Sequence, residues 1–137
     1  MIFHINRLTL KPNLTEEQRR EALDLLRQAG AANPAVQSFV VGRDLGGDFE
    51  WGAVYVLKDL DGYWKYLEHP VHVNEELTGV ELLERFQVID ITDSDDPDIG
   101  EEIAKLQVRH MEEHPDIAAL IAKAPSFTVP DGKGSTA

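Results

Sequence analysis

The sequence has 137 residues, a length typical of a single domain that buries its core without covalent cross-links. It contains no cysteine, which excludes disulfides, thiolate nucleophiles and cysteine-ligated metal centres. Its 25 acidic and 13 basic side chains give a net charge of −12, which repels phosphate backbones, so we expect no nucleic-acid partner. Neither a signal-peptide pattern nor an apolar run of roughly 20 residues is visible, so we expect a cytoplasmic protein with no membrane partner.

The first two elements are indicated by polarity and by a capping motif. Residues 2–10 alternate between two faces, which predicts a strand. Thr15 and Gln18 form a capping box, so a helix should begin at about Thr15. Gly30 follows the apolar stripe of this helix and is the expected position of its end.

The middle of the chain completes a recognisable order of elements. Further strands are predicted over residues 36–41, 49–57 and 86–91, and two short helices, separated by His69-Pro70, over residues 59–67 and 70–77. The order β-α-β-β-α-β predicts an α+β, ferredoxin-like subunit with an antiparallel sheet and helices on one face. Tyr63 and Trp64 are expected to pack between helix and sheet.

The composition changes after Ile91. An acidic linker over residues 93–98 precedes a helix over 98–113, and 116–123 add one or two further turns. The Pro-, Gly- and Ser-rich end of the chain is expected to be disordered. The predicted organisation is a domain over 1–92, a helical extension over 93–124 and a disordered tail over 125–137.

One face of the predicted sheet lacks a covering layer. The sequence places apolar and aromatic residues on that uncovered face: Leu8, Trp51, Ala53, Tyr55 and Val88. An exposed apolar face of this size needs a partner, and a second copy of the chain is the economical one. We therefore expect a homodimer.

Acid/base chemistry is favoured by one dense segment, residues 66–72. It holds a phenol at Tyr66, a carboxylate, and imidazoles at His69 and His72. An imidazole takes and returns a proton near neutral pH, and a tyrosine hydroxyl can hydrogen-bond a carbonyl oxygen as charge develops. The segment therefore indicates His72 as a base and Tyr66 as the group that orients a substrate.

A structural role for the same histidines stays open, with His69 as a helix cap and His72 as a hydrogen-bonded core residue. Metal binding by this pair is disfavoured, because Pro70 distorts the helix between them and spacing offers no third ligand. We therefore expect no metal. No nucleotide or phosphate-binding motif is present, so no cofactor is expected either.

The chain resembles the stress-responsive dimeric α/β-barrel (Dabb) family. The resemblance rests on His4 in the first strand, the helix start Thr15–Gln18, the segment 36–42 (VQSFVVG) and the His-Pro-x-His motif within 66–72 (YLEHPVH), and it extends to residues 86–90. It covers residues 1–92. The family implies a ferredoxin-like subunit that dimerises into a barrel.

The residues also resemble the plant polyketide cyclase branch of that family, which implies aldol-type ring closure. The resemblance gives His72 the role of general base and Tyr66 that of holding the substrate, with His4 lining the pocket and Asp90 orienting the catalytic histidine. The expected substrate-binding residues are His4, Asn6, Leu8, Leu23, Leu26, Trp51, Ala53, Tyr55 and Asp90. Trp51 departs from the branch, which has a histidine there.

Three functions follow from this comparison. The first is an enzyme acting on a small, apolar carbonyl or phenolic compound as a cyclase, isomerase or lyase. The second is a non-catalytic, stress-responsive or ligand-binding homodimer in which the histidines are structural. The third is a cofactor-free monooxygenase of the same barrel fold, which the His-Pro-x-His motif does not favour.

Overall fold

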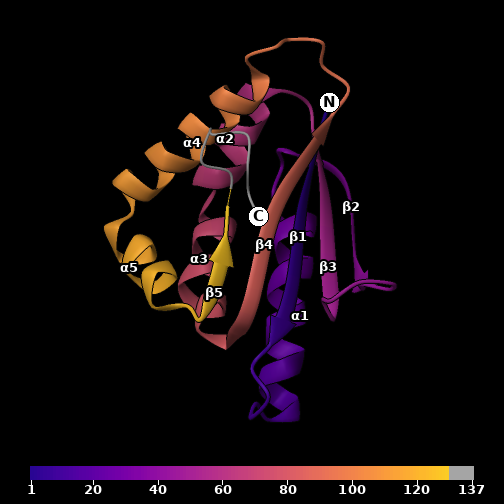
Figure 1. The fold of residues 1–137 in the computed structure, drawn as a ribbon, viewed down its shortest axis with the longest axis vertical. Helices are drawn as coiled ribbons and strands as arrows, with labels where there is room; N and C mark the ends of the chain where they lie inside the picture. Colours follow the sequence, from indigo (N-terminus) through magenta and orange to yellow (C-terminus); the bar gives the residue numbers. More distant parts are fainter. Residues whose placement is uncertain (130–137) are drawn as a thin grey trace.

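The computed structural model describes residues 1–129 and confirms the ferredoxin-like α+β fold, with one sheet and helices on one of its faces (Figure 1). The helices and strands are β1 (Ile2–Leu10), α1 (Glu16–Ala31), β2 (Val36–Arg43), β3 (Trp51–Leu57), α2 (Leu60–Glu68), α3 (Pro70–Gly79), the 3₁₀ turn η1 (Val80–Leu82), β4 (Leu83–Thr92), α4 (Ile99–Glu113), α5 (Pro115–Lys123) and β5 (Ser126–Thr128). No helix in this part of the chain is long and apolar enough to cross a membrane.

The sheet has the order β2-β3-β1-β4-β5, and β1 lies at its centre. The first four strands pair antiparallel, whereas β4 and β5 pair in parallel. In this register, His4 lies between Tyr55 on β3 and Asp90 on β4. The register therefore brings residues from three strands together at the helix-covered face.

The apolar residues assigned to the uncovered face lie on the opposite, helix-covered face, so that assignment is wrong. Leu8, Ala53, Tyr55 and Val88 are buried, and the Tyr55 hydroxyl donates to the Leu26 carbonyl of α1 over 2.7 Å. Trp51 lies opposite Leu8 in the register and packs against the same core, partly buried. Alternation separates two faces of a strand, but it does not say which face the helices cover.

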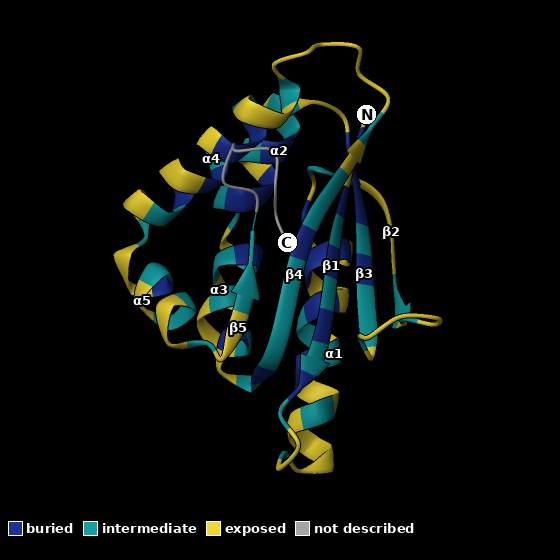
Figure 2. Cartoon of the chain, viewed as in Figure 1, coloured by how far each residue is buried: buried dark blue, intermediate teal, exposed yellow. Residues whose placement is uncertain are grey.

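The uncovered face is nevertheless apolar, because the other set of alternating residues also contains large aliphatic side chains. Val40, Ile91 and Phe3 are 61%, 59% and 37% exposed on it, and Ile5, Val54 and Ile89 lie partly buried between them. Figure 2 shows buried and exposed residues alternating along α4, one side of which is buried against the rest of the chain. The sheet face has no such layer over it within residues 1–129.

Helix α1 begins as predicted and ends for a different reason. The Thr15–Gln18 capping box is formed, but the helix runs past Gly30 to Ala31. Gly30 is instead a contact point, because a Cβ atom there would lie 2.4 Å from the Phe39 ring on β2. The glycine lets α1 approach the sheet closely.

Replacing Gly30 with alanine should destabilise the protein by about 1–2 kcal/mol, although alanine favours helices. The added methyl group displaces the Phe39 ring at its base, an overpacking cost that exceeds the gain in helix propensity. Gly100 in α4 is the matched control, because no atom lies within 4 Å of a Cβ there. Gly100→Ala should raise stability in urea unfolding; equal effects of the two substitutions would contradict this explanation.

The C-terminal extension is packed onto the domain. Ile103 and Ala104 of α4 and Ile117 of α5 are buried, and β5 stacks Phe127 on Phe86 with ring centroids 4.5 Å apart. Residues 126–128 of the tail expected to be disordered therefore form a strand. Residues 130–137 of that tail lie outside the described residues.

Candidate active site

A cavity lies between the sheet and the helices, and the extension forms part of its wall. Its volume is ≈ 60 Å³, which is room for a few water molecules. The lining residues are His4, Asn6, Leu8, Ala22, Leu25, Leu26, Leu67, His72, Glu75, Glu76, Gly79, Val80, Leu83, Phe86, Val88, Gln107, Met111, Ile121, Phe127 and Val129. Most of this wall is apolar, and its polar groups are concentrated around the two histidines.

His72 is held in the first turn of α3 by the backbone around His69-Pro70. Pro70 begins α3, and the His69 side chain accepts the backbone N–H of Val71. The Nδ1–H of His72 donates to the Leu67 carbonyl over 2.9 Å and lies 3.2 Å from the Glu76 carboxylate. Nε2 makes no hydrogen bond to any residue of 1–129, so this ring nitrogen is available as an acceptor. Burial lowers the pKa of His72, which favours the neutral form that can accept a proton.

His4 has a carboxylate partner of its own. Its Nδ1 lies 2.8 Å from Asp90 and 3.0 Å from the Tyr63 hydroxyl, which in turn donates to Asp90 and accepts from Gln107. This network fixes Nδ1 as the protonated nitrogen and leaves Nε2 toward the cavity side without a partner in residues 1–129. Asp90 therefore orients His4, and the expected pairing of Asp90 with His72 is not formed.

Tyr66 is close to both histidines but is not part of the cavity lining. Its ring centroid lies 4.6 Å from that of His72 and 5.3 Å from that of His4. Its hydroxyl group is buried and has no hydrogen-bond partner in the described residues, and burial raises its pKa well above the usual value for a phenol. The hydroxyl is therefore a neutral donor held beside the two imidazoles.

The other predicted substrate-binding residues divide into two groups. His4, Asn6, Leu8 and Leu26 line the cavity. Leu23, Trp51, Ala53, Tyr55 and Asp90 do not; the first four pack in or against the core. The helix-facing side of the sheet holds more residues than the cavity can contact, so a shared face does not suffice to place a residue in the site.

Several site residues were not predicted at all. Gln107, Met111, Ile121 and Phe127 come from the extension, and Glu75 and Glu76 follow the His-Pro-x-His motif. Glu75 has a buried carboxyl oxygen without a partner in residues 1–129, and burial raises its pKa well above the usual range for a glutamate. The raised pKa favours a protonated carboxyl group that could donate a hydrogen bond into the cavity. The sequence gives no signal for Glu75, because it joins the other lining residues only in the folded chain.

A second polar cluster lies behind this wall. His110 of α4 is fully buried, with Nδ1 2.5 Å from Glu68 and Nε2 2.6 Å from Glu76. Burial alone would lower the pKa of His110, but the hydrogen bonds and negative charges of Glu76 and Glu68 outweigh it and raise that pKa. Glu76 thus connects this cluster to His72.

The comparisons with known proteins agree with the fold. The model of the stress responsive A/B barrel domain family, Dabb, matches residues 2–93. A search of curated proteins gives no significant match.

Among solved structures, a Dabb family protein with a ferredoxin-like fold from Mesorhizobium loti is 25% identical, with a TM-score of 0.61, and covers 68% of this chain and 96% of its own. A dimeric ferredoxin-like protein of unknown function from Thermobifida fusca is 24% identical, with a TM-score of 0.59, covering 66% and 89%. A hydroxynitrile lyase from Passiflora edulis is 15% identical, with a TM-score of 0.60, covering 68% and 94%. The share of this chain that these structures cover is close to the length of the family domain, residues 2–93, which does not include the C-terminal extension.

Proposed function

Because this chain belongs to the stress-responsive A/B barrel (Dabb) family, we propose that its cavity is the active site of an acid/base enzyme. The substrate is a small, largely apolar carbonyl or phenolic compound, and the reaction is of the aldol-cyclase, isomerase or lyase class. His72 is the general base. Tyr66, expected to hold the substrate, lies behind the cavity lining and positions the His72 ring, with the two ring centroids 4.6 Å apart. No cofactor takes part in these steps.

One observation carries the proposal. The only hydrogen-bond donor of His72 is already directed at Leu67, so the nitrogen left over is an unprotonated acceptor beside an apolar cavity. A histidine kept for structure alone would have both nitrogens paired once buried to this extent. His72 is 6% exposed and its Nε2 has no partner in the described residues.

The proton steps follow from this geometry. His72 Nε2 takes a proton from a carbon next to a carbonyl, or from a hydroxyl group of the substrate. The imidazolium that results is stabilised by Glu76, 3.2 Å from Nδ1, until the proton returns to the product. Glu75, which lines the cavity and whose raised pKa favours the protonated form, supplies a donor for the substrate oxygen on which negative charge develops.

The size and character of the cavity favour a substrate with few polar groups. Leucines, Val88, Phe86, Phe127 and Met111 form most of its wall. One structure of the same fold is a hydroxynitrile lyase from Passiflora edulis. Aromatic cyanohydrins and phenolic ketones are therefore the substrates to test first.

Replacing His72 with glutamine should lower kcat by about 100-fold or more on any substrate found in that panel, because general-base catalysis contributes about 10²–10⁴-fold. Aldehyde release from an aromatic cyanohydrin, or consumption of a phenolic ketone, is followed by absorbance. His69→Asn is the matched control, since asparagine can still accept the Val71 N–H and the residue lies outside the cavity lining.

The non-catalytic alternative makes a different prediction. If His72→Gln changes the affinity for phenols or aldehydes by NMR titration while neither protein turns any of them over, the catalytic role of His72 is wrong and the cavity is a binding site. A loss of activity equal to a loss of folded protein would also remove the support for His72 as the base.

We also infer that the protein is a homodimer formed through the uncovered sheet face. The dimeric relative from Thermobifida fusca has the same fold. The exposed aliphatic residues on β2 and β4 support this inference, since an apolar surface of this kind needs a partner. The second copy completes the barrel on the side of the sheet away from the cavity.

A further inference from the structure

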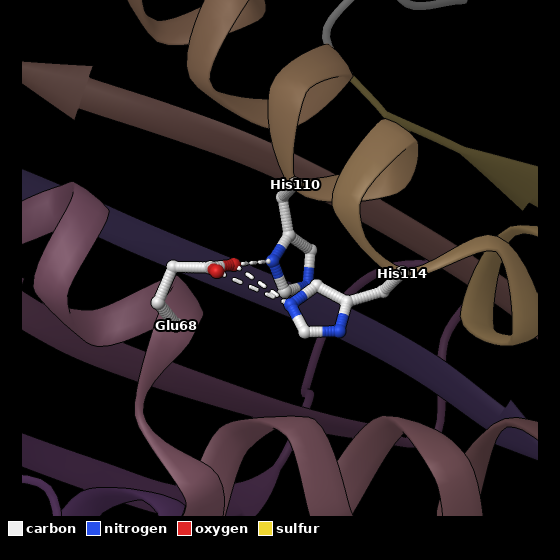
Figure 3. A group of neighbouring side chains, drawn as sticks. All are labelled: Glu68, His110 and His114. Atoms are coloured by element: carbon white, nitrogen blue, oxygen red, sulfur yellow. Dashed lines mark hydrogen bonds and ion pairs between the residues drawn. The ribbon is translucent and has the colours of Figure 1, made fainter.

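Three side chains from two distant segments meet outside the cavity wall (Figure 3). Glu68 is the last residue of α2, and His110 and His114 lie at the end of α4. The Glu68 carboxylate lies 2.5 Å from His110 Nδ1 and 3.0 Å from His114 Nε2. All three donor atoms lie within 4.8 Å of one another. We call these three residues the Glu68 cluster.

The local structure explains why the three groups converge. His110 and His114 are four residues apart, so they lie on the same face of the helix, as paired metal-ligating histidines do. Helix α2 ends at Glu68, with His69 as its cap immediately before Pro70, and this break leaves Glu68 pointing at α4. The extension therefore presents two imidazoles to a carboxylate of the domain.

His110 carries more acceptors than a neutral imidazole can satisfy. Glu68 lies at its Nδ1 and Glu76, 2.6 Å away, at its Nε2. A neutral imidazole has one N–H, so one nitrogen would present its lone pair to a carboxylate. One further proton, on the imidazole or on a carboxyl group, or a bound cation is therefore required among His110, Glu68 and Glu76.

We propose that the Glu68 cluster is a binding site for one divalent transition-metal ion, and that this ion is Zn²⁺. The ligands are the Glu68 carboxylate, His110 Nδ1 and His114 Nε2. Two imidazoles and one carboxylate are a donor set typical of zinc sites with an open fourth position, and they suit Zn²⁺ better than the oxygen-preferring Mg²⁺ or Ca²⁺. Small side-chain rotations would bring the donors to the separation of about 3.3 Å that tetrahedral bonds of 2.0–2.1 Å require.

Glu76 then hydrogen-bonds the metal ligand His110 without binding the metal itself. Ligating histidines commonly donate their other N–H to a carboxylate, which fixes the tautomer and the ring orientation. Glu76 stands in that position at His110 Nε2. A second group of His72, Glu76 and His110 is also compact, but His72 Nδ1 donates to Leu67 and has no lone pair for a metal. The Glu68 cluster is therefore the better site.

Charge and access also fit a dication. Glu68 and Glu76 together bring two negative charges to one buried imidazole, and a single imidazolium neutralises one of them. A divalent ion neutralises both. Glu68 and His114 have side chains 26% and 24% exposed, so an ion can reach the cluster from solvent. This proposal is independent of the catalytic role of His72.

The test is a metal titration of the full chain after treatment with a chelator, without a polyhistidine tag. Zn²⁺ binding by calorimetry should reach one ion per chain, and Co²⁺ should give the intense visible bands of a tetrahedral site. His114→Ala should weaken binding by about 100-fold or more, because it removes a ligand. His69→Asn should leave affinity unchanged, since His69 lies outside the cluster.

Two further variants separate a metal site from a proton-only ion pair. Glu68→Gln should also abolish tight binding, whereas Glu76→Gln should weaken it by about 10–100-fold, as the loss of an outer partner does. Absence of stoichiometric Zn²⁺ and Co²⁺ binding by the wild-type chain would overturn the proposal, whatever the variants do. Binding that His114→Ala and His69→Asn retain equally would overturn it as well.

Discussion

A chain carrying Val40→Asp and Ile91→Asp together should sediment as a 15.3 kDa monomer, whereas the wild-type chain should sediment at twice that mass. Both side chains are more than half exposed in the single subunit, on the uncovered face of β2 and β4. The substitutions therefore change little in the subunit itself, but dimerisation would bury four unpaired carboxylates. We expect the dimer dissociation constant to rise by about 1,000-fold or more.

Leu45→Asp is the matched control for this experiment. Leu45 is 75% exposed, but it lies in the turn between β2 and β3, off the sheet face. This variant should remain dimeric and shows that an added carboxylate alone has no effect. A monomeric wild-type chain, or a double variant as dimeric as the control, would remove the sheet face as the interface.

Replacing Tyr63 with phenylalanine should lower the free energy of unfolding by about 2–4 kcal/mol, although only one oxygen atom is lost. That oxygen donates to Asp90 and accepts from Gln107, and both partners would be left in a buried environment. Hydrogen bonds to charged groups contribute about 1.5–3 kcal/mol, and an orphaned buried amide adds to the loss. Urea unfolding measures the effect directly.

Tyr55→Phe is the control, because the Tyr55 side chain is equally buried and its hydroxyl makes one hydrogen bond. Its acceptor is a helix carbonyl that keeps its backbone donor, so the loss should be about 1 kcal/mol. Equal losses in the two variants would show that the Asp90–Tyr63–Gln107 network adds nothing beyond a neutral hydrogen bond.

The order of elements could be predicted from the sequence because each signal is local. Alternation marked β1, the capping box marked the start of α1, and His69-Pro70 marked the break between α2 and α3. The end of α1 could not be read in this way, since Gly30 serves a contact with Phe39, a residue on the next strand. In a sequence, a glycine that ends a helix cannot be distinguished from a glycine that allows a helix to approach a strand closely.

The site could be predicted only in part, for a physical reason. His4 and His72 were found because each stands in a local pattern. Gln107, Met111 and Phe127 reach the cavity from a segment whose own sequence indicated a helix and a tail. One signal was available: His110 and His114 are spaced as ligands on one helix face, but Glu68 can be matched to them only when α2 and α4 are seen together.

The position of the extension in the chain also decides when the cavity closes. Synthesis delivers all four antiparallel strands and α1–α3 by Thr92, and domains generally begin to fold as they emerge. The side of the cavity formed by the sheet, α1 and α3 is therefore complete before Gln107, Met111 and Phe127 have left the ribosome. A nascent chain in which residues 1–92 have folded holds an open groove, and the extension that follows them in the chain closes it.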